Sequence, residues 1–383
     1  MKIFATIASL LLIILSLAGC GGGSSSAPAA TTIVSGIASK GPIINGVVKI
    51  FSVLNDAKGP LLVQTTTDAT GNYKADIGAY TGPIMVEASG SYLDEATGLT
   101  KTIPADSPLH AALPLAQGNL NLPVTALTEL AFTKVGSSLN ATTISAANTL
   151  ISDLFKVDIT TTLPVAPTTE ALATATQAQK DYTLALATVS QLASAATGTS
   201  DSDKLNNALS TLGQGITSDG MTTETADSIR SALDDFVSNT NNETGVSDTS
   251  STSLVNAGTF SKTYKLSLQG NFTPGAVTGL QFNLTIPSGV TLSVNNLNLA
   301  VLTSSLALSG NAPSGALLTG KYAANTLTVG LISTSALTGE LITLTCNIPA
   351  GVTAPGAAAF TVSNLKSIDK NAATVMGVSV AVN

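Results

Sequence analysis

GLQFNLTIP, residues 279–287, carries an apolar side chain at every second position, at Leu280, Phe282, Leu284 and Ile286. Because successive side chains of a strand point to opposite faces, this alternation predicts a strand that is buried on one face only. The same period returns at Val290, Leu292, Val294, Leu327, Val329, Leu331, Met376, Val378, Val380 and Val382. Pro-Gly and Pro-x-Gly turns separate these runs. About eight or nine strands in residues 255–383 predict an antiparallel, jelly-roll-like β-sandwich.

The order of these runs resembles a cohesin-like domain. Residues 279–287 match its early strand, residues 329–333 a later strand and residues 339–344 the strand after that. Residues 286–290 differ from dockerin-binding cohesins, which carry a Tyr-Asp turn there. The resemblance implies a noncatalytic module with a protein or carbohydrate partner.

Upstream, the sequence changes character twice. Residues 239–254 are polar and aperiodic, which predicts a linker. Residues 119–238 show apolar stripes at three-four spacing and predict an α-helical bundle. Thr125 is placed to cap the first helix, and the longest helix is expected over residues 169–196. The pair Asp234 and Asp235 is expected on a solvated helix face.

Residues 33–118 contain short β-prone runs separated by turn clusters, which predicts a first β-sandwich. Asp68 opens a turn that closes with Gly71 and Asn72 before Tyr73 begins the next strand. This T-D-x-x-G-x-Y pattern resembles carboxypeptidase-regulatory-like, prealbumin-type (Ig-type) domains, which are mostly structural or adhesion modules. The fold class predicted for the whole chain is therefore multidomain α+β.

Two features of this first domain suggest sharper chemistry. Asp94 and Glu95 could contribute to a calcium site, but calcium needs six to eight oxygens, so a solvated turn is the favoured interpretation. Lys40 or Lys49 with an asparagine could form an intramolecular isopeptide bond, as in some adhesins that these domains resemble. That bond would require a buried acid beside the pair, which a sequence does not reveal.

The first 20 residues combine Lys2, an apolar run and Leu-Ala-Gly-Cys, which predicts a secretory signal rather than a membrane-spanning helix. The segment resembles the bacterial lipobox, which implies lipid attachment at Cys20 and an anchored mature chain. Residues 21–32 are rich in Gly, Ser and Ala and predict a flexible tether. With Gly21 rather than Asp after the cysteine, the resemblance implies the outer membrane, at the cell surface or on the periplasmic face.

Composition excludes several classes of function. The net charge of −7 and the lack of any Lys/Arg cluster argue against nucleic-acid binding, because the phosphate backbone is bound by clustered cations. The one histidine, His110, has no nucleophile-elbow serine to activate and is interpreted as a structural or surface residue. Cys346 lies on the predicted strand face of Ile342, Leu344 and Ile348 and is interpreted as a core residue. No catalytic residue, metal site or cofactor is predicted.

Two interpretations of function remain. The favoured one is a lipid-anchored, extracytoplasmic, noncatalytic binding, adhesion or scaffold protein that presents the cohesin-like module to an envelope protein or polysaccharide. The alternative is an envelope-associated polysaccharide hydrolase that works through carboxylates, although aromatic residues make up 4% of the chain and tryptophan is absent. An acidic, aromatic-lined cleft would favour the hydrolase, and a flat exposed sheet face would favour the binding module.

Overall fold

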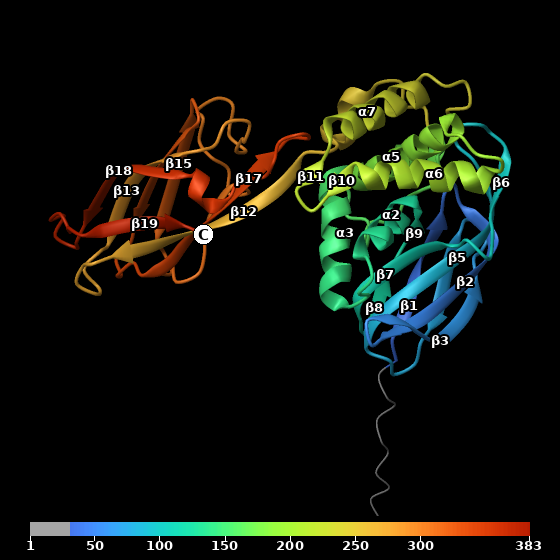
Figure 1. The fold of residues 1–383 in the computed structure, drawn as a ribbon, viewed down its shortest axis with the longest axis horizontal. Helices are drawn as coiled ribbons and strands as arrows, with labels where there is room; N and C mark the ends of the chain where they lie inside the picture. Colours follow the sequence, from blue (N-terminus) through green and yellow to red (C-terminus); the bar gives the residue numbers. More distant parts are fainter. Residues whose placement is uncertain (1–30) are drawn as a thin grey trace, which may run out of the picture.

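The computed structural model describes residues 31–383, so Cys20, the signal segment and residues 21–30 of the expected tether lie outside the described residues. The described chain is mixed α+β, with several antiparallel sheets. Two lobes are visible in Figure 1: one combines the first β-region with the helices, and the other holds the C-terminal strands. No helix within residues 31–383 is long and apolar enough to cross a membrane.

The first β-region consists of two sheets. One has the order β3-β2-β5-β6 with β7 paired to β5, and the other has the order β4-β1-β8 with β9 paired to β1. The strands are β1 (Ile33–Ser39), β2 (Ile43–Leu54), β3 (Ala57–Thr66), β4 (Asn72–Asp76), β5 (Gly82–Leu93), β6 (Thr100–Ile103), β7 (Leu109–Ala116), β8 (Asn119–Asn121) and β9 (Val124–Thr125). The Asp68 turn forms as predicted, because its carboxylate accepts from the backbone N–H groups of Thr70 and Asn72, and Gly71 has φ +83°.

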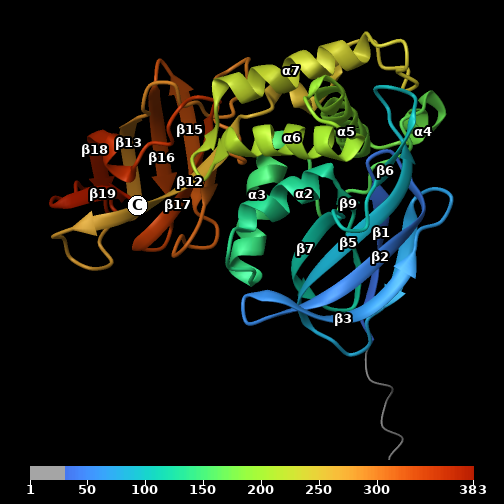
Figure 2. The same cartoon turned by 45° about the vertical axis from the view of Figure 1, so that its right-hand side comes forward.

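The helices begin at side-chain caps. Thr125 forms a capping box at the start of α2, as predicted, whereas α3 is capped by Asn140. The helices are α2 (Ala126–Val135), α3 (Ala141–Phe155), α4 (Thr169–Thr174), α5 (Gln177–Ala195), α6 (Asp201–Gln214) and α7 (Thr223–Val237), with a hairpin of β10 (Ile216–Thr217) and β11 (Gly220–Met221) before α7. Figures 1 and 2 show the helices over one end of the first β-region.

The prediction of a single helix over residues 169–196 is wrong. The chain turns extended at Ala175 and Thr176, and Thr176 starts α5 as a new N-cap with its own capping box. A threonine hydroxyl that accepts from the N–H group three residues later favours the start of a new helix over continuation of the previous one. At Thr176 a new helix starts. Asp234 and Asp235 are exposed on α7, as expected.

The C-terminal lobe is a sandwich of two four-stranded sheets with the orders β14-β17-β12-β19 and β15-β16-β13-β18. Its strands are β12 (Phe260–Gly270), β13 (Gly279–Thr285), β14 (Leu306–Leu308), β15 (Leu317–Ala323), β16 (Thr326–Ile332), β17 (Gly339–Ile348), β18 (Thr361–Ile368) and β19 (Val378–Val382), with a short 3-10 helix, η4 (Ala357–Ala359), before β18. The predicted inward positions of β13 and β16 are all buried. Other predicted inward positions are less buried: Val294 and the β19 residues Val378, Val380 and Val382 are half-buried, and Met376, which precedes the edge strand β19, is 79% exposed.

The segment expected as a linker, residues 239–254, is held against the helices by specific contacts. It continues into two short 3-10 helices, η2 (Thr249–Ser251) and η3 (Ser253–Asn256). Asp181 of α5 is buried, and its carboxylate accepts from the hydroxyls of Thr252 at 2.7 Å and Ser253 at 2.6 Å. Leu254 is fully buried. The polar composition suggested exposure, and much of the segment is exposed. Thr252 and Ser253 differ because they hydrogen-bond a buried carboxylate.

Candidate functional site

Polar groups gather at three places in the described residues: a buried charged cluster, a pocket at His110 and an open sheet face. No group of three or more His, Cys, Asp or Glu side chains in residues 31–383 could hold a metal ion. Cys346 lies on β17, fully buried as predicted, and burial raises the pKa of its thiol to about 12. Its sulfur is therefore protonated and shielded at neutral pH.

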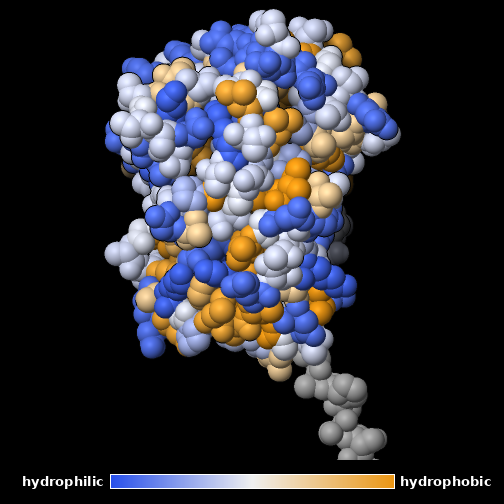
Figure 3. Space-filling view, turned by 90° about the vertical axis from the view of Figure 1, so that its right-hand side faces the viewer, coloured by the Kyte–Doolittle hydropathy of each residue, from blue (hydrophilic) through white to orange (hydrophobic). Residues whose placement is uncertain are grey.

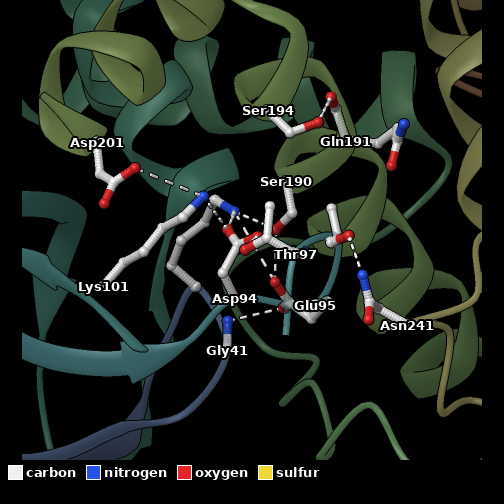
Figure 4. Close-up of polar contacts among 12 residues, drawn as sticks. Gly41, Asp94, Glu95, Thr97, Lys101, Ser190, Gln191, Ser194, Asp201 and Asn241 are labelled. Carbon is white, nitrogen blue, oxygen red and sulfur yellow. Dashed lines mark hydrogen bonds and ion pairs between the residues drawn. The ribbon is translucent and has the colours of Figure 1, made fainter. Parts of the chain in front are cut away.

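The buried charged cluster comprises Lys40, Asp94, Glu95, Lys101 and Ser190. Figure 4 shows the carboxylates of Asp94 and Glu95 between Lys101 and Ser190 of α5. The ammonium of Lys40 lies 3.9 Å from an oxygen of each carboxylate and hydrogen-bonds Ser190. Lys101 adds a contact of 3.3 Å to Asp94, and the Ser190 hydroxyl donates to Glu95. The expectation of a solvated turn at Asp94 and Glu95 is wrong, because 1% of Asp94 and 7% of Glu95 are exposed.

This arrangement determines what the cluster can do. Two ammonium groups occupy the space where a calcium ion would have to sit, and the second carboxylate oxygen of Glu95 accepts from the backbone N–H of Gly41 at 2.7 Å. Within residues 31–383, no asparagine hydrogen-bonds or ion-pairs with Lys40. Burial lowers the pKa of Lys40 more than the neighbouring carboxylates raise it. Because Lys40 and Ser190 are both fully buried, the cluster joins the β-region to α5 rather than meeting a substrate.

The pocket at His110 is polar and has a volume of about 520 Å³. His110 lies on β7, opposite Glu87 of β5, which in turn is opposite Lys49 of β2. Glu129 of α2 accepts from the backbone N–H of His110 at 2.6 Å and lies 2.7 Å from its Nδ1. The imidazole stacks on Phe132 with ring centroids 4.5 Å apart. Sequence reasoning missed this assembly, because its carboxylates come from elements distant in the chain.

The open sheet face belongs to β15, β16, β13 and β18 of the C-terminal sandwich. One cross-strand row consists of Thr319, Gly330, Gln281 and Lys366, and the next of Lys321, Thr328, Asn283 and Ser363. The face is solvent-exposed at Gln281, Thr319 and Thr328, and a shallow groove of about 630 Å³ crosses it.

The groove is non-aromatic and mainly apolar, with Leu317 and Ile332 exposed in its lining beside hydroxyl, amide and ammonium groups. Gly330 keeps the groove open, since a Cβ there would lie 2.9 Å from the Thr319 hydroxyl oxygen. No acidic and no aromatic residue lines the groove, whereas Lys321 and Lys366 do. Hydroxyl, amide and ammonium groups on a rigid sheet can hydrogen-bond a peptide backbone or sugar hydroxyls, but they supply no paired carboxylates for glycoside hydrolysis.

No known protein family matches the sequence, and no curated protein matches it significantly. Among solved structures the chain is similar to a non-cellulosomal cohesin from the hyperthermophilic archaeon Archaeoglobus fulgidus, at 13% sequence identity and a TM-score of 0.19, with 29% of this chain and 83% of that chain covered. A TM-score this low does not establish a shared fold. The cohesin-like, prealbumin-type and lipoprotein resemblances therefore stay predictions.

Proposed function

We propose that the protein is a lipid-anchored, extracytoplasmic, noncatalytic binding or scaffold protein. A lipid on Cys20 anchors the chain to the outer membrane. From there the C-terminal sandwich presents the β15-β16-β13-β18 face to a protein or carbohydrate of the cell envelope. The observation that supports this proposal best is the exposed, rigid sheet face, whose groove combines apolar surface at Leu317 and Ile332 with hydroxyl, amide and ammonium groups.

The face can be tested with the full-length protein as bait in envelope extracts and on a glycan array. The double variant Thr319→Glu/Thr328→Glu places two carboxylates in the groove and should abolish capture of the partner. Thr263→Glu changes an exposed threonine on the outer side of the other sheet and serves as the matched control. Equal capture by all three proteins would show that the face is not used.

The anchor has an independent test. Metabolic labelling with a palmitate analogue should mark the wild type, and Cys20→Ala should remove both the label and the membrane association. A Cys20→Ala protein that remains labelled to the same extent would disprove lipid attachment at this residue.

A carboxylate-based polysaccharide hydrolase remains the second candidate because of the His110 pocket. Glu87 and Glu129 flank the imidazole there, and both carboxylates are less than one-fifth exposed. Glu87 also pairs with Lys58, so one of the two carboxylates is already compensated by a lysine. Release of reducing sugar from envelope polysaccharide that disappears in Glu129→Gln and in Glu87→Gln would favour the hydrolase over the binding protein.

A further inference from the structure

A pocket of about 720 Å³ lies in the lobe that holds the helices, away from the proposed binding face. Its walls come from the turns before β2, between β3 and β4 and after β5, from residues 163–168 between α3 and α4, and from residues 240–243 after α7. This volume falls within the range of small-molecule pockets in proteins.

The walls are mainly apolar and are held in place before any ligand arrives. Ile44 and Leu93 line the pocket and are 45% and 49% exposed, an unusual exposure for side chains of this size. The segment with Pro164 and Pro167 is fixed to α5, because Val165 exchanges hydrogen bonds with the Thr183 hydroxyl at 3.0 and 3.2 Å. A pre-formed apolar wall lowers the conformational cost of binding.

The amide and charged groups at the pocket are acceptors or are already paired, and the Thr240 hydroxyl can donate or accept. No lysine, arginine or histidine lines it. The amides of Asn72 and Asn241 donate through Nδ2 to protein oxygens, so that their amide oxygens remain to accept. Glu243 is exposed at the pocket, whereas the wall residues Asp94 and Glu95 are already paired with Lys40. The pocket therefore offers hydrogen-bond acceptors and one unpaired negative charge.

We propose that this pocket binds a small organic molecule with an apolar body and a hydrogen-bond-donating, amine-type head group. The apolar body lies against Ile44 and Leu93, and the head group meets the amide oxygens and the Glu243 carboxylate. An anionic head group of the same size is disfavoured, because no cation faces it and Glu243 repels it. The site is independent of the proposed function of the C-terminal sheet face.

Three probes of equal length test the head group: 4-phenylbutylamine, 4-phenylbutanol and 4-phenylbutyrate. Binding to the full-length protein, in nanodiscs if it partitions into membranes, is measured by saturation-transfer NMR and calorimetry against empty nanodiscs. We expect affinity to fall in the order amine, alcohol, carboxylate. Absence of saturable binding by all three probes, or a carboxylate that binds as well as the amine, would overturn the proposal.

Matched variants test the location. Leu93→Asp should weaken binding of the alcohol probe by about tenfold or more, whereas Leu61→Asp, at an equally exposed leucine outside the pocket, should leave it unchanged. Glu243→Lys should weaken the amine by about fivefold and spare the alcohol. Asp235→Lys on α7 is the charge control. Equal losses in a variant and its control, with native circular dichroism, would show that the probes bind elsewhere.

Discussion

The two β-sandwiches of this chain are built from similar strands but use their outer faces in opposite ways. In the first, the outer side of the sheet at Val53, Met85 and Ala112 is buried under α2 and α3 in a second small core. In the C-terminal sandwich, the outer side at Gln281, Thr319 and Thr328 is open. A covered sheet belongs to one folding unit with its helices. The buried residues of the C-terminal sandwich are continuous with those of the other lobe, but its two sheets bury their inner faces against each other, so we expect this sandwich to stand alone and present a surface.

The largest effect expected from this difference is all-or-none folding of fragments. Residues 31–118 expressed alone should remain unfolded, because the apolar outer side of their sheet would lose the helices that cover it. Residues 31–257 should fold, and residues 255–383 should form a soluble, β-rich monomer. Circular dichroism and size-exclusion chromatography distinguish these outcomes. A folded 31–118 fragment, or an unfolded 255–383 fragment, would contradict the comparison.

The next largest effect is expected when the Lys40 charge is removed from the buried charged cluster that joins the first β-region to α5. Lys40→Met should cost about 3–5 kcal/mol of unfolding free energy, since Asp94 and Glu95 would stay buried with one cation fewer. The exposed Lys74→Met is the matched control and should change stability by about 0.5 kcal/mol or less. Urea denaturation measures both, and equal values would show that the cluster contributes nothing.

The same lysine predicts a pH dependence. Burial lowers the pKa of Lys40 below 10.5, so between its folded value and 10.5 the unfolded chain binds more protons and stability rises with pH. Burial raises the pKa values of Tyr73 and Tyr182 above 10, and these groups oppose the rise only above about pH 10. Burial also lowers the pKa of Lys134, which adds to the rise, and raises the pKa of the Cys346 thiol from 9.0 to about 12, which opposes it from about pH 9. Both groups are present in the wild type and in Lys40→Met, so in denaturation experiments the difference in unfolding free energy between the two proteins should increase with pH just below pH 10.

A smaller effect is expected inside the C-terminal sandwich. Cys346→Ser should cost about 1–3 kcal/mol, because it places a hydroxyl at a fully buried apolar position, and Cys346→Ala should cost less. Binding through the open face should be unchanged. Thiol labelling of the native protein should be slow, since burial raises the pKa of the thiol to about 12. Rapid labelling without denaturant would refute this assignment.

The smallest expected effect is the difference in lost stability between two variants that each remove a helix N-cap hydroxyl. Thr125→Ala should cost about 1–2 kcal/mol and Thr222→Ala about 0.5–1 kcal/mol. Both hydroxyls accept from the N–H group three residues later, but Thr125 is buried and also hydrogen-bonds the Tyr182 hydroxyl at 2.8 Å, whereas Thr222 is exposed. Thermal unfolding of the two variants checks the order, and a larger loss at Thr222 would contradict it.

Local patterns were sufficient for much of the fold. The alternation of Leu280, Phe282 and Leu284 placed β13 and its buried face, and Thr125 marked the start of α2. The apolar stripe over residues 169–196 did not reveal the cap at Thr176. A threonine can cap a helix or lie within one, and the spacing of the apolar residues around it is the same in both cases. Met376 was misplaced because the alternation continues two residues upstream of the start of β19, into a segment that is not part of the strand.

The sequence by itself determined the periods, the turns, the caps and the buried position of Cys346, since each depends on neighbours a few residues away. Only the tertiary structure decided that Asp94 and Glu95 are buried, that Glu129 meets His110 from 19 residues away, and that Asp181 holds Thr252 and Ser253. A charged side chain is exposed or buried according to whether a partner arrives from another element. That partner is fixed by the packing of sheets and helices, which no local period encodes.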